Sequence, residues 1–149
     1  MYEVQEVDGC LNRHILEEFN ALDPYFPDLQ DRHFRNGYWW LVTKPDHPAA
    51  VGEVEAAVGF AGLVPFEPFE GVGYFKRCFI IPGHRGGLQI RLMYQRELKA
   101  RQLGWHKLVS ECLETNTHSA NNFRRAGFEQ FIPEQKWGED GSIYFAKTL

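Results

Sequence analysis

Hydrophobic positions recur along the chain at two spacings, one of about four residues that is typical of helices and one of about two that is typical of strands. Helices are predicted at residues 11–22, 88–103 and 118–126. The first carries Leu11, Ile15 and Phe19 on one face and ends at Asp23-Pro24. Gly104 ends the second, which is the longest.

Strands are predicted at residues 2–7, 39–43, 58–64, 74–81, 107–113, 128–132 and 143–147. Gly59 and Gly62 make the third of these strands weak, and Pro65 stops it. A polar turn region is expected from Pro45 to Glu55, and a looser segment around Tyr25. Strands that alternate with helices, followed by a hairpin-like pair, predict an α/β domain around a mixed sheet.

Composition and charge narrow the class of protein. The chain has 149 residues, of which 44% are hydrophobic, enough for one domain over residues 1–149 with a buried core. Its formal net charge of -4 argues against a general nucleic-acid binder and fits a cationic substrate better. The N-terminus lacks a hydrophobic signal region, and no apolar run is long enough to span a membrane, so we expect a soluble cytoplasmic protein.

Three cysteines, Cys10, Cys78 and Cys112, are widely spaced and odd in number. Neither a disulfide framework nor a zinc site has this pattern. We therefore expect buried thiols in a reducing compartment, and no bound metal.

Residues 81–89 have the pattern of a strand end, a glycine turn and a helix start. Gly86 and Gly87 allow close approach of the backbone, and the helix start presents N–H groups to an anion. Arg85 adds a permanent charge with a donor fork suited to phosphate. Taken alone, such a segment is more often a plain tight turn. The three-glycine dinucleotide fingerprint and the P-loop ending are absent, so dinucleotides and nucleoside triphosphates are not the leading ligands.

A second segment has the positions Asn116, Ser119, Phe123, Gly127 and Phe128. This spacing resembles the Asn-x-x-Ala/Ser-x-x-x-Tyr-x-x-x-Gly-Phe run of the GNAT superfamily of acyl-CoA-dependent N-acetyltransferases. In that family the glycine turn carries an Arg/Gln-x-x-Gly-x-Gly/Ala motif, and residues 80–89 stand in the same place here. The resemblance extends over about residues 39–147. It implies a single-domain GNAT-like fold with a mixed, largely antiparallel twisted sheet, flanked by helices, whose strands splay at the cofactor site.

The resemblance further implies that acetyl-CoA is the co-substrate. Its pantetheine arm would pair with the backbone of the central strand as an added strand, and its pyrophosphate would lie on the glycine turn. Helix capping explains Asn116 and Ser119 as well as cofactor contact does. The implied cofactor residues are Phe79, Ile80, Ile81, Arg85, Gly86, Gly87, Leu88, Gln89, Asn116, Ser119 and Phe123.

Two positions depart from the family pattern. The glycine turn is one residue shorter than usual, which changes the set of N–H groups that could contact phosphate. Phe123 stands where many relatives carry a tyrosine that acts as general acid. An amine with a pKa of about 10.4 costs about 4 kcal/mol to present as the free base at pH 7, whereas a thiol with a pKa of about 8.5 leaves a deficit of about 2 kcal/mol. The base therefore matters more than the acid.

Two carboxylates are candidates for that base. Glu111 lies on the strand before Asn116, and Glu70 lies just ahead of the central strand, from where it could act through water. For each, a solvated surface carboxylate is the competing interpretation. The aromatic loops at Tyr25–Phe34 and Pro65–Glu70 belong to the half of the chain that shapes the acceptor pocket in GNAT proteins. With nearby acidic residues they suit a cationic amine.

The expected function is transfer of an acetyl group from acetyl-CoA to a primary amine of a small molecule or peptide, by direct attack in a ternary complex. One alternative is a non-catalytic acyl-CoA-binding or regulatory protein that keeps the fold, and another is an interaction domain without a cofactor. No nucleic-acid or membrane partner is expected, and a homodimer stays open.

Overall fold

The computed structural model describes residues 2–44, 57–84 and 86–149. The polar turn region predicted from Pro45 to Glu55 and the predicted phosphate contact Arg85 lie outside these residues. In chain order the described elements are β1 (Glu3–Val7), α1 (Arg13–Ala21), α2 (Asp31–Arg35), β2 (Tyr38–Thr43), β3 (Ala57–Pro65), β4 (Val72–Ile80), α3 (Leu88–Gln102), β5 (Lys107–Leu113), α4 (Thr117–Arg125), β6 (Glu129–Phe131) and β7 (Ser142–Thr148).

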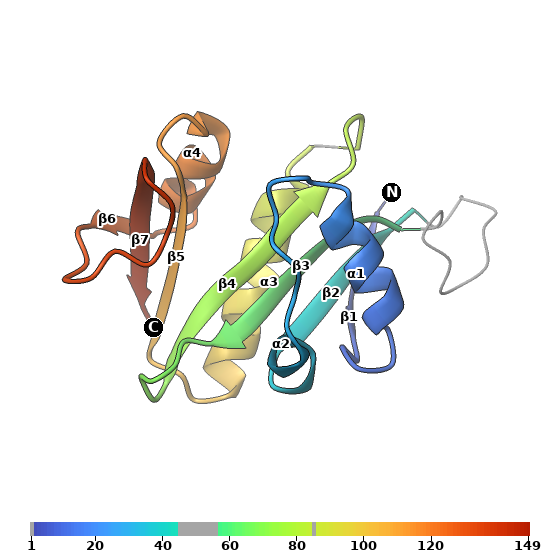
Figure 1. The fold of residues 1–149 in the computed structure, drawn as a ribbon, viewed down its shortest axis with the longest axis horizontal. Coiled ribbons are helices and arrows are strands. Elements are labelled where there is room, and N and C mark those ends of the chain that lie inside the picture. Colours follow the sequence, from blue (N-terminus) through green and yellow to red (C-terminus); the bar gives the residue numbers. More distant parts are fainter. Residues whose placement is uncertain (1, 45–56, 85) are drawn as a thin grey trace. The chain divides into compact units, whose positions relative to one another are not determined.

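The described strands form a seven-stranded sheet in the order β1-β2-β3-β4-β5-β7-β6 (Figure 1). The pairs β1–β2, β2–β3, β5–β7 and β6–β7 are antiparallel, and the pair β4–β5 is parallel. This confirms the predicted α/β class with a mixed, largely antiparallel sheet and flanking helices. The parallel pair follows from the long connection through α3, since parallel strands need a crossover.

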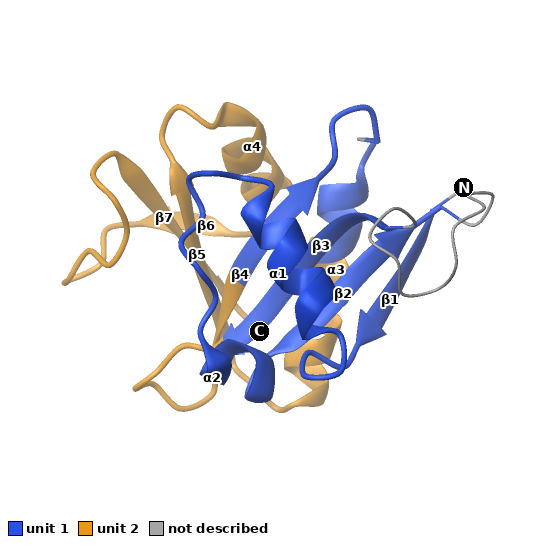
Figure 2. Ribbon diagram, turned by 45° about the vertical axis from the view of Figure 1, so that its right-hand side comes forward, with its two compact units in different colours: residues 1–64, 76–92 blue, residues 65–75, 93–149 orange. Residues whose placement is uncertain are grey.

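Two compact units divide the chain (Figure 2). Unit 1 has residues 1–64 and 76–92, and unit 2 has residues 65–75 and 93–149. β4 and α3 each contribute residues to both units. The expectation of one domain over the whole chain stays a prediction.

The core of unit 1 lies between α1 and the strands. Ile15, Leu16 and Phe19 share one helical face and belong to a buried cluster with Trp39 and Phe60. The ring centroids of Phe19 and Phe60 are 5.4 Å apart, and those of Trp39 and Phe60 are 6.0 Å apart. The predicted helical face therefore packs as expected.

The ends of the first predicted helix lie outside α1. Leu11 is 79% exposed and Leu22 is 49% exposed. The Asp8 carboxylate accepts the N–H groups of Cys10 and Leu11 at 2.9 Å each, so residues 8–11 form a turn instead of helix.

The cysteines are less buried than predicted. Cys10 is exposed because it lies in that turn, while Cys78 and Cys112 are partly buried, and all three are free. Burial, together with the neighbouring Glu111 carboxylate, raises the pKa of the Cys112 thiol to about 11. That thiol is therefore protonated at neutral pH.

β3 is a stronger strand than its glycines predict, because eight of its nine residues are buried. A Cβ added at Gly62 would lie 2.6 Å from a ring carbon of Trp39, and one added at Gly59 would lie 2.6 Å from Cδ1 of Ile80. The glycines therefore make room for large side chains of the neighbouring strands.

The core of unit 2 is aromatic. The Phe123 ring stacks on Phe145 at 4.9 Å and meets Phe128 edge-on at 5.3 Å, and Phe75 lies 5.3 Å from Phe128. The guanidinium of Arg96, which is 1% exposed, lies 4.0 Å above the Phe75 ring. A cation over a ring face is stabilised by the ring quadrupole, so this contact contributes to the stabilisation of the buried charge.

Candidate functional site

The glycine turn connects β4 to α3 within unit 1. Gly86 and Gly87 have φ angles of 133° and 79°, which residues other than glycine rarely adopt. A Cβ added at either residue would meet no described atom within 4 Å. The turn therefore presents its backbone to open space, as a phosphate site requires.

α3 begins directly after this turn. The Gly87 carbonyl accepts the N–H of Arg91 at 3.0 Å, the first hydrogen bond of the helix. The N–H group of Leu88 lies in the first turn, where an α-helix provides no acceptor. A helix of 15 residues with this start can stabilise an anion at its N-terminus.

Tyr2 contacts the same region from the N-terminus. Its hydroxyl and Nδ1 of His84 share a hydrogen bond of 3.1 Å, and both terminal nitrogens of Arg91 donate to its carbonyl at 3.3 Å. The sequence gives no signal for this contact, because 82 positions separate Tyr2 from His84. The contact fixes two basic side chains beside the glycine turn.

The hydrogen bonds at the end of β4 bear on the expectation that the Ile81 backbone pairs with the pantetheine arm. The Ile81 N–H donates to the Val58 carbonyl at 2.8 Å, and the Ile81 carbonyl accepts the His84 N–H at 3.1 Å. Pairing of the Ile81 N–H with a pantetheine arm is not compatible with the first of these bonds. Because successive residues of a strand direct their backbone groups to opposite edges, Ile80 faces the other edge of β4.

In unit 2, both oxygens of the Glu111 carboxylate accept hydrogen bonds. The Tyr74 hydroxyl donates to Oε1, and the Trp137 Nε1–H donates to Oε2 at 2.7 Å. Hydrogen bonds to an ionised acceptor are strong and fix its orientation. A carboxylate has about four acceptor sites, so these two bonds leave each oxygen able to accept a further proton.

Aromatic rings pack beside the two donors. The Phe66 ring lies 5.7 Å from Tyr74 and 4.9 Å from Trp137, and Trp137 lies 4.5 Å from Tyr144. Sequence reasoning included Phe66 among the acceptor-side aromatics but missed Trp137 and the role of Tyr74. No local pattern joins them, because Trp137 is 26 positions from Glu111.

The two candidate bases do not converge. Glu70 stands two residues before Val72, whose register partner is Lys107, and Glu111 stands four residues beyond Lys107. At about 3.3 Å per residue, their backbones are separated by roughly 20 Å along the strand direction. The Glu70 side chain is exposed, and its carbonyl contacts the His106 ring at 3.2 Å. Of the two, Glu111 is the carboxylate that accepts hydrogen bonds from Tyr74 and Trp137, and a catalytic role for either residue stays a prediction.

α4 shows the capping role of Asn116 directly. The Asn116 side chain accepts the Ser119 N–H at 3.2 Å at the start of the helix. Gly127 follows the helix with a φ of 91°, as a C-terminal glycine does. Phe123 is 5% exposed within the aromatic core. Cofactor contact by Asn116, Ser119 and Phe123 stays a prediction.

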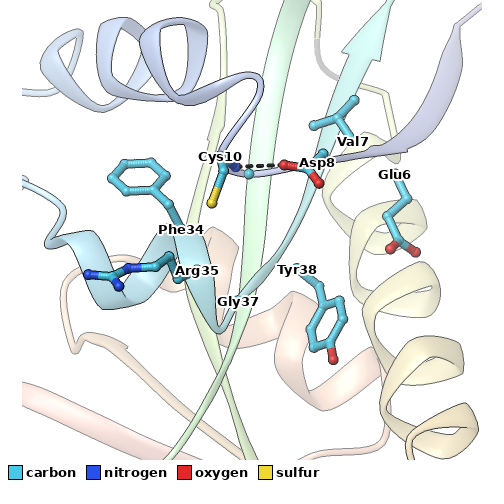
Figure 3. A pocket seen from close by; sticks show the side chains of 9 residues that line it. Glu6, Val7, Asp8, Cys10, Phe34, Arg35, Gly37 and Tyr38 are labelled. Carbon is cyan, nitrogen blue, oxygen red and sulfur yellow. Dashed lines mark hydrogen bonds between the residues drawn. The ribbon is translucent and has the colours of Figure 1, made fainter.

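A cavity of about 400 Å³ lies elsewhere in unit 1, where β1 ends and β2 begins (Figure 3). Glu6, Asp8, Cys10, Arg35 and Tyr38 are among its lining residues. None of the implied cofactor residues lines it, so it is separate from the expected site.

No group of three or more His, Cys, Asp or Glu side chains among the described residues is arranged to hold a metal ion. None of the helices that the described residues form has both the length and the apolar character needed to cross a bilayer.

Comparison with known proteins gives similar results at the level of sequence and of fold. An "IAA acetyltransferase" of Azospirillum brasilense is 28% identical over 150 residues, which cover 95% of each chain. The solved structure of an IAA acetyltransferase from Bacillus cereus ATCC 14579 has a TM-score of 0.72 at 15% identity, over 100% of both chains. An acetyltransferase of Bacillus subtilis in complex with CoA has a TM-score of 0.69 at 15% identity, over 99% of this chain and 97% of that one.

The structural likenesses concern the fold alone, and the family assignment comes from the sequence. Residues 14–128 match the model of the acetyltransferase (GNAT) family. This match includes the glycine turn, α3 and α4, which carry the resemblance noted above. The chain therefore belongs to the acetyltransferase (GNAT) family and is an acyltransferase.

Proposed function

We propose that the protein transfers an acetyl group from acetyl-CoA to a primary amine of a small molecule or peptide, by direct attack in a ternary complex. The observation that carries this proposal is the Glu111 carboxylate, held from both oxygens by Tyr74 and Trp137. Membership of the family supports an acyl-CoA donor. The relatives named IAA acetyltransferase do not define the acceptor of this chain.

The donor would be bound through the central strand and the turn that follows it. Gly86, Gly87 and the first turn of α3 suit the pyrophosphate, with Arg85 as a further predicted contact. The backbone of Ile80 suits the pantetheine arm. An arm that starts at the glycine turn and follows β4 runs back from Ile80 toward the middle of that strand, where the thioester would lie.

The reaction needs a deprotonated amine. In the proposed step Glu111, directly or through one water, accepts a proton from the ammonium group, and the amine nitrogen then attacks the thioester carbonyl carbon. The C–N bond forms, the C–S bond breaks, and coenzyme A leaves as its thiolate. The attacking nitrogen then loses its second proton, through water, to that thiolate, which gives the neutral amide and the free thiol. A backbone N–H of β4 would stabilise the oxyanion. Phe123 supplies no proton, which is tolerable because a thiolate is a good leaving group near neutral pH.

Glu70 is the second candidate for the base. Its exposed position ahead of β4, about six residues from the level of Glu111, gives it no contact with the same group of donors. We therefore assign the base to Glu111 and use Glu70 as the matched control.

The acceptor class follows from the same group of side chains. A negative carboxylate beside the rings of Phe66, Tyr74 and Trp137 favours a cationic amine through charge attraction and cation–π contact. A series of primary amines of similar size, cationic or neutral at pH 7, tests this preference by KM. Equal KM values for both groups would remove the cationic acceptor from the proposal.

Two measurements separate the candidate functions. Calorimetry with acetyl-CoA measures binding, and release of free thiol with an amine panel measures turnover. Binding with amine-dependent thiol release is the expected result. Binding without turnover for any amine indicates the alternative, a non-catalytic acyl-CoA-binding or regulatory protein, and no binding indicates an interaction domain.

A further inference from the structure

β4 contains one residue with an unusual backbone. Arg77 has a φ of 57°, and it is the only non-glycine residue with a positive φ in the part of the chain that the structure describes. Such a conformation in the middle of a strand persists only where surrounding contacts determine it. The contacts of the Arg77 side chain identify what those surroundings are.

The Arg77 guanidinium reaches a loop that is distant in sequence. Its Nε donates to Oδ1 of Asn20 at 2.8 Å, and its Nη2 donates to the carbonyl of Pro27 at 2.9 Å. The guanidinium carbon lies 4.8 Å from the centre of the Phe26 ring. One side chain of β4 therefore contacts both α1 and the loop of residues 22–30, which connects α1 to α2.

Asn20 completes this group of contacts. It is 3% exposed, on the otherwise apolar face of α1, and its Nδ2 donates to the same Pro27 carbonyl at 2.9 Å. Both halves of the buried amide are thus hydrogen-bonded, and the Pro27 carbonyl accepts two donors. Buried polar groups with complete partners fix one arrangement of the elements that they connect. We call Asn20, Phe26, Pro27 and Arg77 the loop lock.

Apolar packing and hydrogen bonds both hold this loop. Leu29 is 7% exposed and belongs to the hydrophobic core of unit 1, and Phe26 packs against that core. The Tyr25 N–H donates to the Asp23 carboxylate and the Phe26 N–H to the Asp23 carbonyl, at 2.9 Å and 3.1 Å. Arg77 adds a hydrogen bond and a cation–π contact that tie the loop to β4.

The position of Arg77 on β4 gives the loop lock a functional meaning. Arg77 stands three residues before Ile80, about 10 Å along the strand at the usual rise, on the side away from the glycine turn. In the proposed function the pantetheine arm runs in this direction, which brings the thioester to the level of Arg77. A loop held at that level borders the carbonyl that the amine must approach.

We propose that Arg77 is a positioning residue that, with Asn20, holds residues 22–30 against β4 and so sets how tightly the amine acceptor binds. This inference rests on the proposed function for its link to the acceptor. The holding of the loop is a separate claim, which can be measured without any substrate.

Arg77→Gly is the main variant, because glycine accepts the positive φ without strain while the whole side chain, with its guanidinium, is removed. We expect hydrogen exchange at the amides of residues 25, 26 and 28–30 to rise about tenfold or more, as is usual when a loop opens locally. We expect KM for the amine to rise by about tenfold, with kcat and acetyl-CoA affinity changed by less than about threefold. Asn20→Ala should reproduce both effects, and the double variant should add little to either single one.

Two further variants serve as controls. Arg77→Lys keeps the charge with a single donor group and should partly restore both KM and protection from exchange. Arg13 also lies over a ring, 4.6 Å from the centre of Phe34, and pairs with Asp31 at 2.8 Å, but it contacts α2 and not the loop. Arg13→Gln should therefore leave the loop amides and the amine KM unchanged.

Unchanged exchange at residues 25–30 in Arg77→Gly would overturn the loop lock. Increased exchange with an unchanged amine KM would overturn its role in acceptor binding. If Arg77→Gly does not fold, the Arg77→Lys and Asn20→Ala pair decides by the same readouts. Absence of amine turnover in the unaltered protein would instead mean that the proposed function fails, and exchange at the loop amides would still test the lock.

Discussion

Arg77 in unit 1 and Glu111 in unit 2 are both charged side chains held by two directed hydrogen bonds. Arg77 donates to a side-chain amide and a backbone carbonyl, whereas Glu111 accepts from a phenol and an indole. The partners of Arg77 belong to a loop and a helix, so its bonds hold a segment of chain in place. The partners of Glu111 are rings that orient a carboxylate, which keeps acceptor sites for a proton. We therefore propose that Arg77 positions the loop and that Glu111 takes part in the chemistry.

The largest expected effect is on kcat/KM when Glu111 is replaced. Glu111→Gln keeps the shape of the side chain and removes its basicity. We expect kcat/KM for the amine to fall by about 100-fold or more, the usual contribution of a general base. Affinity for acetyl-CoA, measured by calorimetry, should stay within about threefold because Glu111 is not assigned to the donor.

Glu70→Gln is the matched control, with the same chemical change at an exposed carboxylate. Its kcat/KM should stay within about twofold of the unaltered protein, as for most surface substitutions. If kcat/KM falls as much in Glu70→Gln as in Glu111→Gln, or more, the general base is Glu70 and not Glu111.

A second prediction concerns the pH dependence of stability that arises from His33 in unit 1. Burial, with added repulsion from Lys76, Arg32 and Arg77, lowers the pKa of His33 from 6.5 to about 4. The unfolded chain therefore binds more protons than the folded protein between these values, and stability falls as the pH drops from about 6.5 to about 4. At about 1.4 kcal/mol per pKa unit, the loss attributable to His33 reaches about 3 kcal/mol. Denaturant unfolding across this pH range measures it.

His33→Gln supplies the control for this effect. The His33 Nδ1 accepts the Gln30 N–H at 2.9 Å in a capping box, and glutamine can accept the same N–H without titrating. The variant should keep the helix and show a flatter dependence of stability on pH between about 4 and 6.5. The same slope in both proteins would show that His33 is not the titrating group.

A third prediction tests whether the proposed reaction is limited by the absence of a general acid at Phe123. Phe123→Tyr restores the tyrosine of many relatives, but here it adds a hydroxyl to a ring that is 5% exposed among Phe128 and Phe145. A buried hydroxyl without a partner costs about 1–3 kcal/mol, so Tm should fall. The rate of thiol release at saturating substrates should not rise. An increase of about tenfold or more would show that proton donation at this position limits the reaction.

The smallest predicted effect concerns the donor. Gly87→Ala places a Cβ where φ is 79° and where the backbone faces open space. The left-handed backbone costs an alanine about 1–2 kcal/mol, so the turn should relax in the free protein. Binding of acetyl-CoA would then have to restore the strained conformation, and the affinity should fall about tenfold. Gly104→Ala is the matched control, since Gly104 has a φ of 77° and equally open surroundings but ends α3. It should lower stability alone, and equal loss of affinity in both would remove the glycine turn from the donor site.

Local patterns predicted most of the fold. The spacing of Ile15 and Phe19 predicted α1, and Gly104 predicted the end of α3. α2 was not predicted, because its five residues are too few for a helical period to be recognised. The glycines of β3 were read as weakness, because a sequence does not show that the Trp39 ring fills the space of the missing Cβ.

The site was predictable only where its residues are close in sequence. The glycine turn and α4 carry recognisable spacings, and their helix starts have the expected geometry. The hydrogen bonds of Glu111 and of Arg77 join residues from 26 to 57 positions apart, which no local pattern encodes. Asn20 gave the nearest signal, as a polar residue on an apolar helical face, and it is the residue that receives Arg77.

The most direct test of the central claim follows a labelled acetyl group from acetyl-CoA. The unaltered protein and Glu111→Gln are each given acetyl-CoA with a ¹³C-labelled acetyl group and a cationic primary amine, and the products are analysed by mass spectrometry. We expect the labelled acetyl group to appear on the amine nitrogen with the unaltered protein, and the same product to form far more slowly with Glu111→Gln. Label that stays on coenzyme A or appears only as acetate with the unaltered protein, for every amine in the panel, would contradict the central claim.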